Sequence, residues 1–350
     1  MKKNKVLLLS TAVSFGGGES YLLNLEKLLK EDYNLELITS SSTLRKKSQI
    51  NTIYLRKIFG FYHFLLFMTL IKLIFSSKIN VAILNGSVEA LYSVLLISFG
   101  IKTVVVKHTD FHPEVDNINN LKNKFHLTAL NQGNCIVSVS KHVYAQLKKF
   151  EKRNQIRNQS IHLIPNWTES KYVNATHKPL NDGSYHILIV ARLVKSKGHL
   201  DLFKACEGLK NIILHVVGDG PLKNEFINKS KNLNIVFHGF QDNVKPFYEF
   251  CHLQVLPSYI EGGHPLCLLE GMAVGIPSIG SNIPTIVEIL PKENICEINN
   301  IPNLRGKIIK FIKSKQNNKI VHHHDNSYKN LLKNLVSNKI EDLPSIEKNS

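Results

Sequence analysis

The chain has 350 residues, more than one hydrophobic core usually serves, so its length favours two domains. Hydrophobic residues make up 43% of the sequence, which excludes a disordered chain. The 44 basic and 27 acidic side chains give a formal net charge of +17, which suits anionic partners such as phosphorylated substrates, anionic lipid headgroups or nucleic acid.

The N-terminal half alternates between apolar strands and helical segments. Strands are predicted at residues 6–10, 35–39, 81–84, 103–106, 136–139 and 161–164. The glycine run Gly16-Gly17-Gly18 follows the first strand and precedes a helix with leucines on one face. The first ten residues lack the long apolar region of a secretory signal, and the five cysteines form no Cys-x-x-Cys pair. We therefore expect a cytoplasmic protein in a reducing compartment.

Residues 59–75 form a strongly apolar segment with basic residues on both sides, Lys57 before it and Lys78 after it. The segment is slightly short for a transmembrane helix of about 20 residues, and it contains His63 and Lys72. We therefore expect a helix packed on a sheet. A helix that leaves aromatic and basic side chains at a bilayer surface is the alternative that the net charge supports.

The second half repeats the alternation after a polar stretch without periodicity at residues 168–184, which we interpret as a linker. Its strands are predicted at residues 186–190, 212–217, 235–237, 253–256 and 277–279. Short buried strands that alternate with helices are typical of a parallel sheet covered on both faces.

The expected fold class is α/β, with two Rossmann-like, doubly wound parallel-sheet domains that face a central cleft. Residues 1–167 would form the N-terminal domain and residues 185–325 the C-terminal domain. Residues 326–350 would form a C-terminal helix and tail, and packing of this helix back on the N-terminal domain is one option.

Two charged loops of the second half each follow a strand and open a helix. Arg192 and Lys197 lie in the first loop, and Glu261 and Glu270 lie in the second loop and its helix. Ligands bind at the carboxyl ends of the strands in an open parallel sheet, so we expect all four side chains at one crevice. Such a set suits a diphosphate with a polyhydroxylated part, as in a nucleotide-sugar. A solvated basic loop, which also contains Lys195, and a solvent-facing Glu270 are the structural alternatives.

Further candidates lie outside these loops. His108 ends a strand of the first half, so its imidazole would reach into the cleft, with a purely structural histidine as the alternative. Gly218 and Gly220 form a turn after a strand, while Gly16-Gly17-Gly18 lacks the spacing of the dinucleotide-binding fingerprint, and the sequence holds no Walker loop. His322-His323-His324 lies in a polar region, where we expect a solvated surface rather than a metal site.

On these residues the second half resembles family 4 of the retaining glycosyltransferases, which have the two-domain GT-B fold. The matching pieces follow the family's order: Ala191-Arg192-Leu193, Lys197-Gly198, Val216-Val217-Gly218-Asp219-Gly220-Pro221, Phe237-His238-Gly239-Phe240, Leu256-Pro257-Ser258, Glu261-Gly262, Leu268-Leu269-Glu270-Gly271-Met272-Ala273 and Gly275-Ile276-Pro277. The first half matches more loosely, through Gly17-Gly18-x-Ser20, His108, Ser138-Val139-Ser140 and Ile164-Pro165-Asn166. The likeness covers residues 5 to about 290.

The resemblance implies a role for each of these positions. Arg192 and Lys197 would hold the donor diphosphate during catalysis, and Glu270 would bind the ribose hydroxyls. Glu261 and His108 would contact the donor sugar. Further donor-binding positions would be Gly17 and Gly18 in the first domain and Gly218, Gly220, Gly262, Gly263, His264, Pro265 and Leu266 in the second. Such enzymes need no metal ion and retain the configuration at the anomeric carbon.

One spacing departs from the family. Eight residues lie between Glu261 and Glu270, where the family has seven. We therefore expect the loop to bulge and to displace Glu261, while the surroundings of Glu270 stay intact.

The resemblance thus implies a metal-independent, retaining hexosyltransferase that uses a UDP- or GDP-linked sugar as co-substrate and no further cofactor. Its acceptor would be a glycan or lipid-linked glycan in bacterial surface polysaccharide synthesis, either lipopolysaccharide O-antigen or capsule. We expect a cytoplasmic location and no nucleic-acid partner, with peripheral contact with an anionic membrane as an option at its inner face. A sugar-nucleotide epimerase on the same scaffold and a non-catalytic basic protein that binds membranes or nucleic acid are the alternatives.

Overall fold

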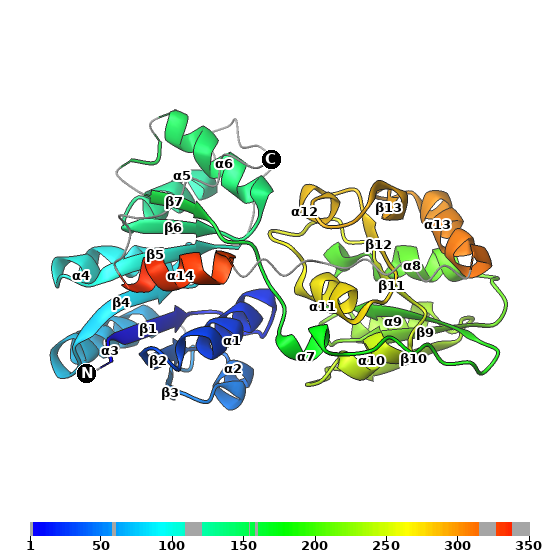
Figure 1. The fold of residues 1–350 in the computed structure, drawn as a ribbon, viewed down its shortest axis with the longest axis horizontal. Helices are drawn as coiled ribbons and strands as arrows, with labels where there is room; N and C mark the ends of the chain where they lie inside the picture. The colour runs from blue at the N-terminus through cyan, green and yellow to red at the C-terminus, as the bar shows by residue number, and fades with distance from the viewer. Residues whose placement is uncertain are drawn as a thin grey trace. The chain divides into compact units, whose positions relative to one another are not determined.

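A computed structural model of the chain describes residues 3–57, 61–108, 121–153, 155–157, 160–314 and 327–337. The chain divides into two compact units. The first unit holds the described residues as far as Pro165 together with the C-terminal helix, and the second unit begins at Asn166. Each unit is built on one parallel sheet covered by helices (Figure 1). This architecture confirms the predicted α/β class with two Rossmann-like parts.

The first unit has seven parallel strands in the order β3-β2-β1-β4-β5-β6-β7. They are β1 (Lys5–Ser10), β2 (Asn34–Thr39), β3 (Asn51–Tyr54), β4 (Ile79–Leu84), β5 (Lys102–Lys107), β6 (Cys135–Ser138) and β7 (Ser160–Leu163). All six predicted strands of this half occur, with ends shifted by at most two residues. The sequence pattern did not predict β3, because this edge strand buries none of its side chains fully.

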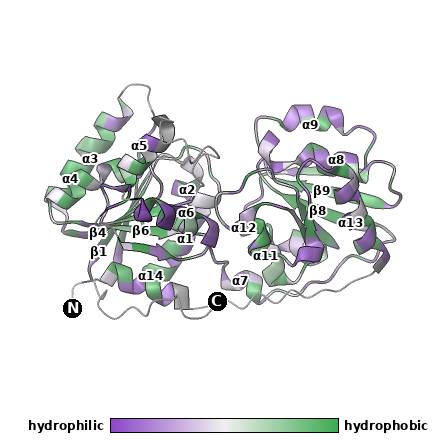
Figure 2. Cartoon of the chain, turned by 90° about the horizontal axis from the view of Figure 1, so that it is seen from above, coloured by the Kyte–Doolittle hydropathy of each residue, from purple (hydrophilic) through white to green (hydrophobic). Residues whose placement is uncertain are grey.

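Helices cover both faces of this sheet. They are α1 (Gly17–Leu29), α2 (Ser42–Lys47), α3 (Tyr62–Ser76), the 3-10 turn η1 (Glu89–Tyr92), α4 (Ser93–Ser98), α5 (Leu121–Leu130), α6 (Lys141–Lys152) and α14 (Ser327–Ser337). Helices α3 to α6 share one core with the strands. The C-terminal α14 lies on the opposite face (Figure 2), where Lys102 Nζ donates to the Leu335 carbonyl at 2.7 Å and Lys333 pairs with Asp32 at 2.6 Å.

Helix α3 corresponds to the apolar segment of the sequence. Its residues Tyr62, Leu66, Leu70 and Leu73 form a stripe that is buried against the sheet. The prediction of a helix packed on the sheet is therefore confirmed. Among the described helices, none combines the length and the apolar character needed to cross a bilayer.

The second unit has six parallel strands in the order β10-β9-β8-β11-β12-β13. They are β8 (Tyr185–Val190), β9 (Ile212–Val217), β10 (Ile235–Gly239), β11 (Leu253–Leu256), β12 (Ser278–Ser281) and β13 (Ile295–Cys296). The five predicted strands occur, with ends shifted by at most two residues. Strand β13 was not predicted, since two residues give no periodic signal.

Helices of the second unit also pack on both sheet faces. They are α7 (Ser170–Val173), η2 (Lys195–Lys197), α8 (His199–Cys206), α9 (Lys223–Lys229), α10 (Lys245–Phe250), α11 (Leu266–Val274), α12 (Pro284–Val287), η3 (Lys292–Asn294) and α13 (Ile301–Ser314). Helices α8, α9 and α13 share a core on one face, while α7, α10 and α11 contribute to a core on the other. Helix α7 falls inside the stretch that we interpreted as a linker, and its Tyr172 is buried.

Both sheets have the strand order of doubly wound nucleotide-binding folds, in which the chain reverses direction across the sheet after its third strand. The reversal brings β1 beside β4 in the first unit and β8 beside β11 in the second. In such sheets ligands bind outside the carboxyl ends of these central strands. The loops after β8 and β11, and after β1 and β4, are therefore where a site is expected.

Candidate functional site

The loop after β8 carries the predicted cations. Arg192 is exposed, and Lys197 lies in the short turn η2 before α8. Gly198 follows with φ +69°, and a Cβ there would lie 2.0 Å from the Pro257 carbonyl oxygen. Only glycine fits this position, because it combines a left-handed backbone with close approach of the loop after β11. The absence of a side chain at Gly198 therefore allows the loops after β8 and β11 to lie in close contact.

Lys197 and Glu261 meet in this arrangement. The Lys197 ammonium forms an ion pair with Glu261 Oε1, and the Ser258 hydroxyl donates to the same oxygen at 2.7 Å. The Lys197 side chain is 23% exposed and that of Glu261 is 11% exposed. The structure thus brings together one predicted cation and one predicted carboxylate at the carboxyl ends of the central strands.

Glu270 lies in α11 and is half-buried. Its Oε2 accepts a hydrogen bond of 3.0 Å from the Tyr248 hydroxyl, and Tyr172 also hydrogen-bonds to it. Burial raises the pKa of Glu270 to about 7, although the Tyr248 hydrogen bond and the charge of Lys171 act in the opposite direction. A carboxylate on this apolar helix needs partners, and two tyrosines provide them. The alternative of a solvent-facing Glu270 is therefore wrong.

The Cys267 thiol lies near both predicted glutamates. Burial raises the pKa of Cys267 to about 12, and the charges of Glu261, Lys197 and Glu270 all act on this thiol. The three predicted charged groups therefore lie near the first turn of α11, which contains Cys267.

The stretch between the glutamates contains further predicted positions. Gly262 and Gly263 are half-buried, Pro265 caps α11, and Leu266 is its first residue. His264 turns inward: its Nε2 lies 2.6 Å from Glu288 Oε2, and its carbonyl accepts from the Asn166 amide at 2.8 Å. The His264 side chain is therefore engaged with Glu288 rather than directed at a ligand, and only its backbone is left for the predicted donor contact.

Gly218 and Gly220 pack against the cationic loop. A Cβ on Gly218 would lie 2.0 Å from the Ala191 carbonyl oxygen, and one on Gly220 would lie 2.5 Å from the Leu193 carbonyl oxygen. The Leu193 amide also donates to the Asp219 carbonyl at 3.0 Å. Close packing between these two loops accounts for both glycines, and it fixes the backbone beside Arg192.

The first unit gathers the other predicted residues. Gly17 begins α1, and the Gly18 carbonyl accepts a hydrogen bond of 3.1 Å from the Asn85 amide. The Asn85 side-chain oxygen Oδ1 lies 2.7 Å from His108 Nε2. Asn85 thus links the predicted glycine run to the predicted histidine at the ends of β1, β4 and β5.

His108 is held as a neutral side chain. Burial and the neighbouring Lys107 lower the pKa of His108 to about 4. The Asn85 amide nitrogen already donates to Gly18, so its oxygen must accept from His108, which assigns the proton to Nε2. A cationic His108 that binds a phosphate does not fit these contacts. The remaining Nδ1 can accept a hydrogen bond from a hydroxyl.

Two buried carboxylates anchor the loop between β1 and α1. Glu89 accepts from the Thr11 amide at 2.6 Å and from the Thr11 hydroxyl at 2.8 Å. Glu19 accepts from the Ser10 hydroxyl at 3.1 Å and from the Gly16 amide at 3.0 Å. Burial raises the pKa of both carboxyls. These contacts fix the backbone that leads into Gly17 and Gly18.

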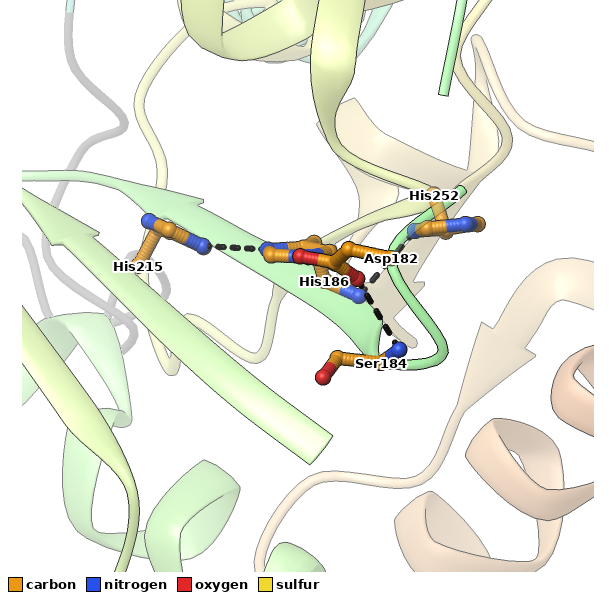
Figure 3. A network of polar contacts seen from close by, with 5 residues as sticks. All are labelled: Asp182, Ser184, His186, His215 and His252. Carbon is orange, nitrogen blue, oxygen red and sulfur yellow. Dashed lines mark hydrogen bonds and ion pairs between the residues drawn. The ribbon is translucent and has the colours of Figure 1, made fainter. Parts of the chain in front are cut away.

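A row of histidines, His186, His215 and His238, crosses the second sheet, and Figure 3 shows the first two with His252 beside them. His186 Nδ1 lies 2.8 Å from His215 Nε2, and His215 Nδ1 lies 2.9 Å from His238 Nε2. His186 Nε2 lies 3.1 Å from both Asp182 oxygens, and the His186 amide donates to His252 Nδ1 at 3.0 Å. Across the part of the chain that the structure describes, no cluster of histidine, cysteine and carboxylate side chains is arranged to hold a metal ion. The run His322-His323-His324 lies outside the described residues.

Sequence reasoning missed the residues that hold the predicted ones in place. Asn85 could have been found from the sequence, since a polar residue that directly follows a predicted strand and precedes Gly86 lies at the carboxyl end of that strand, where a site is expected. Tyr172 and Tyr248 gave none, because they come from helices far from Glu270 in the sequence. Ser258 belongs to a piece that resembles the family, but its contact with Glu261 needed the structure.

Two family models match consecutive parts of the chain. The one described as Glycosyltransferase Family 4 matches residues 15–171, and the one described as Glycosyl transferases group 1 matches residues 174–329. A stretch of 110 residues is 33% identical to the N-acetyl-alpha-D-glucosaminyl L-malate synthase of Bacillus anthracis and covers 29% of this chain and 29% of that protein. The chain therefore matches less than a third of the length of this curated relative.

Solved glycosyltransferases share the fold over nearly the whole chain. The Anabaena protein Alr3699/HepE in complex with UDP-glucose superimposes with a TM-score of 0.77 at 13% identity and covers 97% of this chain and 100% of its own. The lipopolysaccharide outer core galactosyltransferase WaaB in its apo form gives a TM-score of 0.68 at 18% identity and covers 96% of this chain and 100% of its own. At these identities the likeness shows the GT-B fold alone.

Proposed function

We propose, from the premise that this chain belongs to the family 4 glycosyltransferases of GT-B fold, that it transfers a sugar from a nucleotide-sugar to a glycan or lipid-linked glycan with retention at the anomeric carbon. The observation that carries the proposal is the Lys197–Glu261 pair at the carboxyl ends of β8 and β11. It combines a phosphate-binding cation and a hydroxyl-binding carboxylate where doubly wound sheets bind nucleotides.

In the proposed reaction Arg192 and Lys197 neutralise the diphosphate as it leaves. The bond between the anomeric carbon and the diphosphate oxygen breaks, and the acceptor hydroxyl oxygen bonds to that carbon on the same face. The acceptor proton passes to the departing phosphate oxygen. Preorganised cations stabilise the developing charge most effectively when they are partly shielded from water, as Lys197 is.

The remaining residues take positions around the donor in this proposal. Glu270 accepts hydrogen bonds from the ribose hydroxyls. The donor diphosphate takes the place of the Glu261 carboxylate beside the Lys197 ammonium, and Glu261 then accepts hydrogen bonds from the hydroxyls of the donor sugar. His108 contacts the donor sugar as a neutral acceptor through Nδ1. Gly17 and Gly18 line the donor and acceptor side of the first unit.

We propose a UDP- or GDP-linked donor, no further cofactor and no metal ion. The UDP-glucose complex of the Anabaena relative supports a nucleotide-sugar donor. The lipopolysaccharide galactosyltransferase supports a place in bacterial surface polysaccharide synthesis, with O-antigen and capsule as the candidates. A lipid-linked acceptor brings the enzyme to the inner face of the cytoplasmic membrane, so peripheral contact with anionic lipid belongs to the proposal.

A thermal-shift screen against UDP- and GDP-sugars tests the donor class, because a bound donor raises the melting temperature by mass action. The hits are then assayed for nucleotide release with and without glycan acceptors, in the presence of EDTA. Acceptor-dependent release that EDTA leaves unchanged supports the proposal. A free epimerised sugar without acceptor supports the epimerase instead, and failure of every nucleotide-sugar to bind refutes the proposed function.

A further inference from the structure

The outer surface of α3 lacks the polar face of a helix that borders water. Its buried stripe packs on the sheet, and the opposite side carries Phe64, Met68 and Phe75. A surface helix of a soluble domain normally turns charged and polar side chains outward. On this side Lys72 is the only charged residue of the helix.

Helix α4 extends the same apolar surface. His63 Nδ1 lies 2.7 Å from the Tyr92 hydroxyl at one end of α3, and the Phe75 and Phe99 rings pack edge to face at 5.5 Å at the other. The two helices therefore run side by side, with hydrophobic residues along both (Figure 2). We call this surface the α3–α4 face, and its residues, all between 45% and 74% exposed, are Phe61, Phe64, Met68, Phe75, Val94 and Phe99.

The sequence segment that carries the α3–α4 face is predominantly basic. Between Glu36 and Asp110 the sequence holds nine lysines and arginines and a single carboxylate, Glu89. Glu89 is buried and accepts hydrogen bonds from Thr11, so it contributes nothing to the surface. The exposed cations near α3 are Arg56, Lys57, Lys72 and Lys78. An apolar helix that carries and is flanked by exposed lysine and arginine side chains is complementary to anionic lipid headgroups above acyl chains.

The length and packing of α3 show that this helix could lie on a membrane but could not cross it. With 15 residues α3 is about 22 Å long, shorter than the hydrocarbon core of about 30 Å. One side of the helix is also committed to the sheet through Leu66 and Leu70. The helix can therefore present only its outer side to lipid, in the plane of the interface.

We propose that the α3–α4 face docks on an anionic bilayer surface, with Phe64, Met68 and Phe75 entering the interface and Lys57, Lys72 and Lys78 against the headgroups. The assignment deepens the proposed function by naming the membrane-binding surface, and it rests on that function only for the lipid-linked acceptor. Aromatic and aliphatic side chains supply the apolar part of such binding, and each lysine or arginine adds about 1 kcal/mol near an anionic surface.

Co-sedimentation with vesicles tests the surface directly. Wild type should bind vesicles of 70% phosphatidylcholine and 30% phosphatidylglycerol and bind pure phosphatidylcholine far more weakly. The variant Phe64→Ser/Met68→Ser/Phe75→Ser should bind the anionic vesicles at least about tenfold more weakly, since each apolar side chain removed from the interface costs on the order of 1–3 kcal/mol. Lys57→Gln/Lys72→Gln/Lys78→Gln should lose the preference for anionic vesicles.

A matched control removes three exposed apolar residues of the second unit, by Ile227→Ser/Val236→Ser/Phe240→Ser. It should bind vesicles as wild type does. Unchanged binding by the α3 variant overturns the proposal. The proposal is also overturned if the wild-type protein does not bind vesicles but forms dimers that the α3 variant no longer forms, because the α3–α4 face would then join two copies of the chain.

The thermal shift with a nucleotide-sugar separates this proposal from the proposed function. An α3 variant that loses vesicle binding and keeps the donor-induced shift is folded and confirms that the face acts on lipid. Vesicle binding by a wild type that no nucleotide-sugar stabilises would refute the proposed function and leave the membrane surface in place.

Discussion

Lys197 and Glu261 form an ion pair between the loops that follow the adjacent strands β8 and β11. Ser258 donates to the same carboxylate oxygen, so Glu261 is held from both sides. Gly198 makes the pair possible, since any side chain there would strike the Pro257 carbonyl. A donor diphosphate that reaches Lys197 would replace one anion by another and release Glu261 for hydroxyl groups. The pair therefore keeps both groups in position before the donor binds.

Replacing Lys197 by alanine tests this relationship. We expect Lys197→Ala to lower kcat by about 10²- to 10³-fold, the usual cost of removing one preorganised group that stabilises a leaving anion. Steady-state nucleotide release in the presence of acceptor measures the effect. The matched control is Lys195→Ala, an exposed lysine of the same turn, which should stay within about twofold of wild type. Equal losses in both variants would point to general surface charge rather than to the pair.

The contrast between Gly198 and Gly208 tests the contact between the loops. Both glycines have nearly the same left-handed backbone, with φ +69° and φ +71°, but a Cβ on Gly208 meets nothing within 4 Å. Each alanine should cost about 1–2 kcal/mol for the backbone conformation. Gly198→Ala should cost a further 1–3 kcal/mol or so, because the Pro257 carbonyl must move.

Urea unfolding monitored for both variants measures the difference. Gly198→Ala should also weaken donor binding, since the displaced loop carries Lys197 and Glu261. Equal free energies of unfolding for the two variants would mean that the loop after β11 can move away from the added methyl group without loss of stability.

The strands could be predicted because buried parallel strands have continuous apolar sequences, as residues 104–106 and 187–190 do. Their carboxyl ends then located the loops of Lys197 and Glu261. The partners of the site could not be predicted, because Tyr248 and Asn85 reach Glu270 and His108 only through the packing of distant elements. Strands β3 and β13 were not predicted, because β3 has no fully buried side chain and β13 has only two residues.

The ionisation of Glu270 predicts how donor binding depends on pH. Burial raises its pKa to about 7, so below neutrality the carboxyl is protonated and accepts ribose hydroxyls less well. The affinity for a nucleotide-sugar should therefore rise as the pH increases through about 7, while the charge of the diphosphate diester stays constant. Isothermal titration calorimetry between pH 6 and 8.5 measures this dependence.

Tyr248 provides a specific control for that dependence. Its hydroxyl donates to Glu270 and stabilises the ionised form. Tyr248→Phe should move the midpoint of the affinity profile upward by about 0.5–1 pH unit. Glu270→Gln should weaken binding and remove the dependence. An affinity profile that Glu270→Gln leaves unchanged would assign the titration to another group.

The histidine row predicts that the stability of the fold depends on pH, here because burial lowers histidine pKa values rather than raising the pKa of a carboxyl group. Its hydrogen bonds fit three neutral imidazoles that each donate from Nε2, from His238 to His215, from His215 to His186 and from His186 to Asp182. Burial, together with the neighbouring His186 and His238, lowers the pKa of His215 to about 4. His252 accepts from the His186 amide through Nδ1, so its protonation would break that hydrogen bond.

The pKa values of His215, His238 and His252 are lowered in the folded chain, so these three histidines bind protons in the unfolded chain at a pH where they stay neutral in the folded chain. For a histidine whose pKa is lower in the folded state, stability is complete above the unfolded value of about 6.5 and is lost as the pH falls toward the folded value. The free energy of unfolding should therefore decrease between pH 6.5 and about 4, by up to about 1.4 kcal/mol per pH unit for each proton taken up on unfolding.

Replacing His215 by glutamine isolates one of these protons. The glutamine amide can both donate and accept between His186 and His238, and it does not titrate, so the slope of unfolding free energy against pH should fall by about 1.4 kcal/mol per pH unit in this window. The control His63→Gln removes an exposed histidine of the first unit without touching the row. Urea unfolding at pH 4.5, 5.5, 6.5 and 7.5 gives both slopes. If His215→Gln keeps the wild-type slope, the row already carries its proton in the folded state, and the neutral arrangement of N–H groups is wrong.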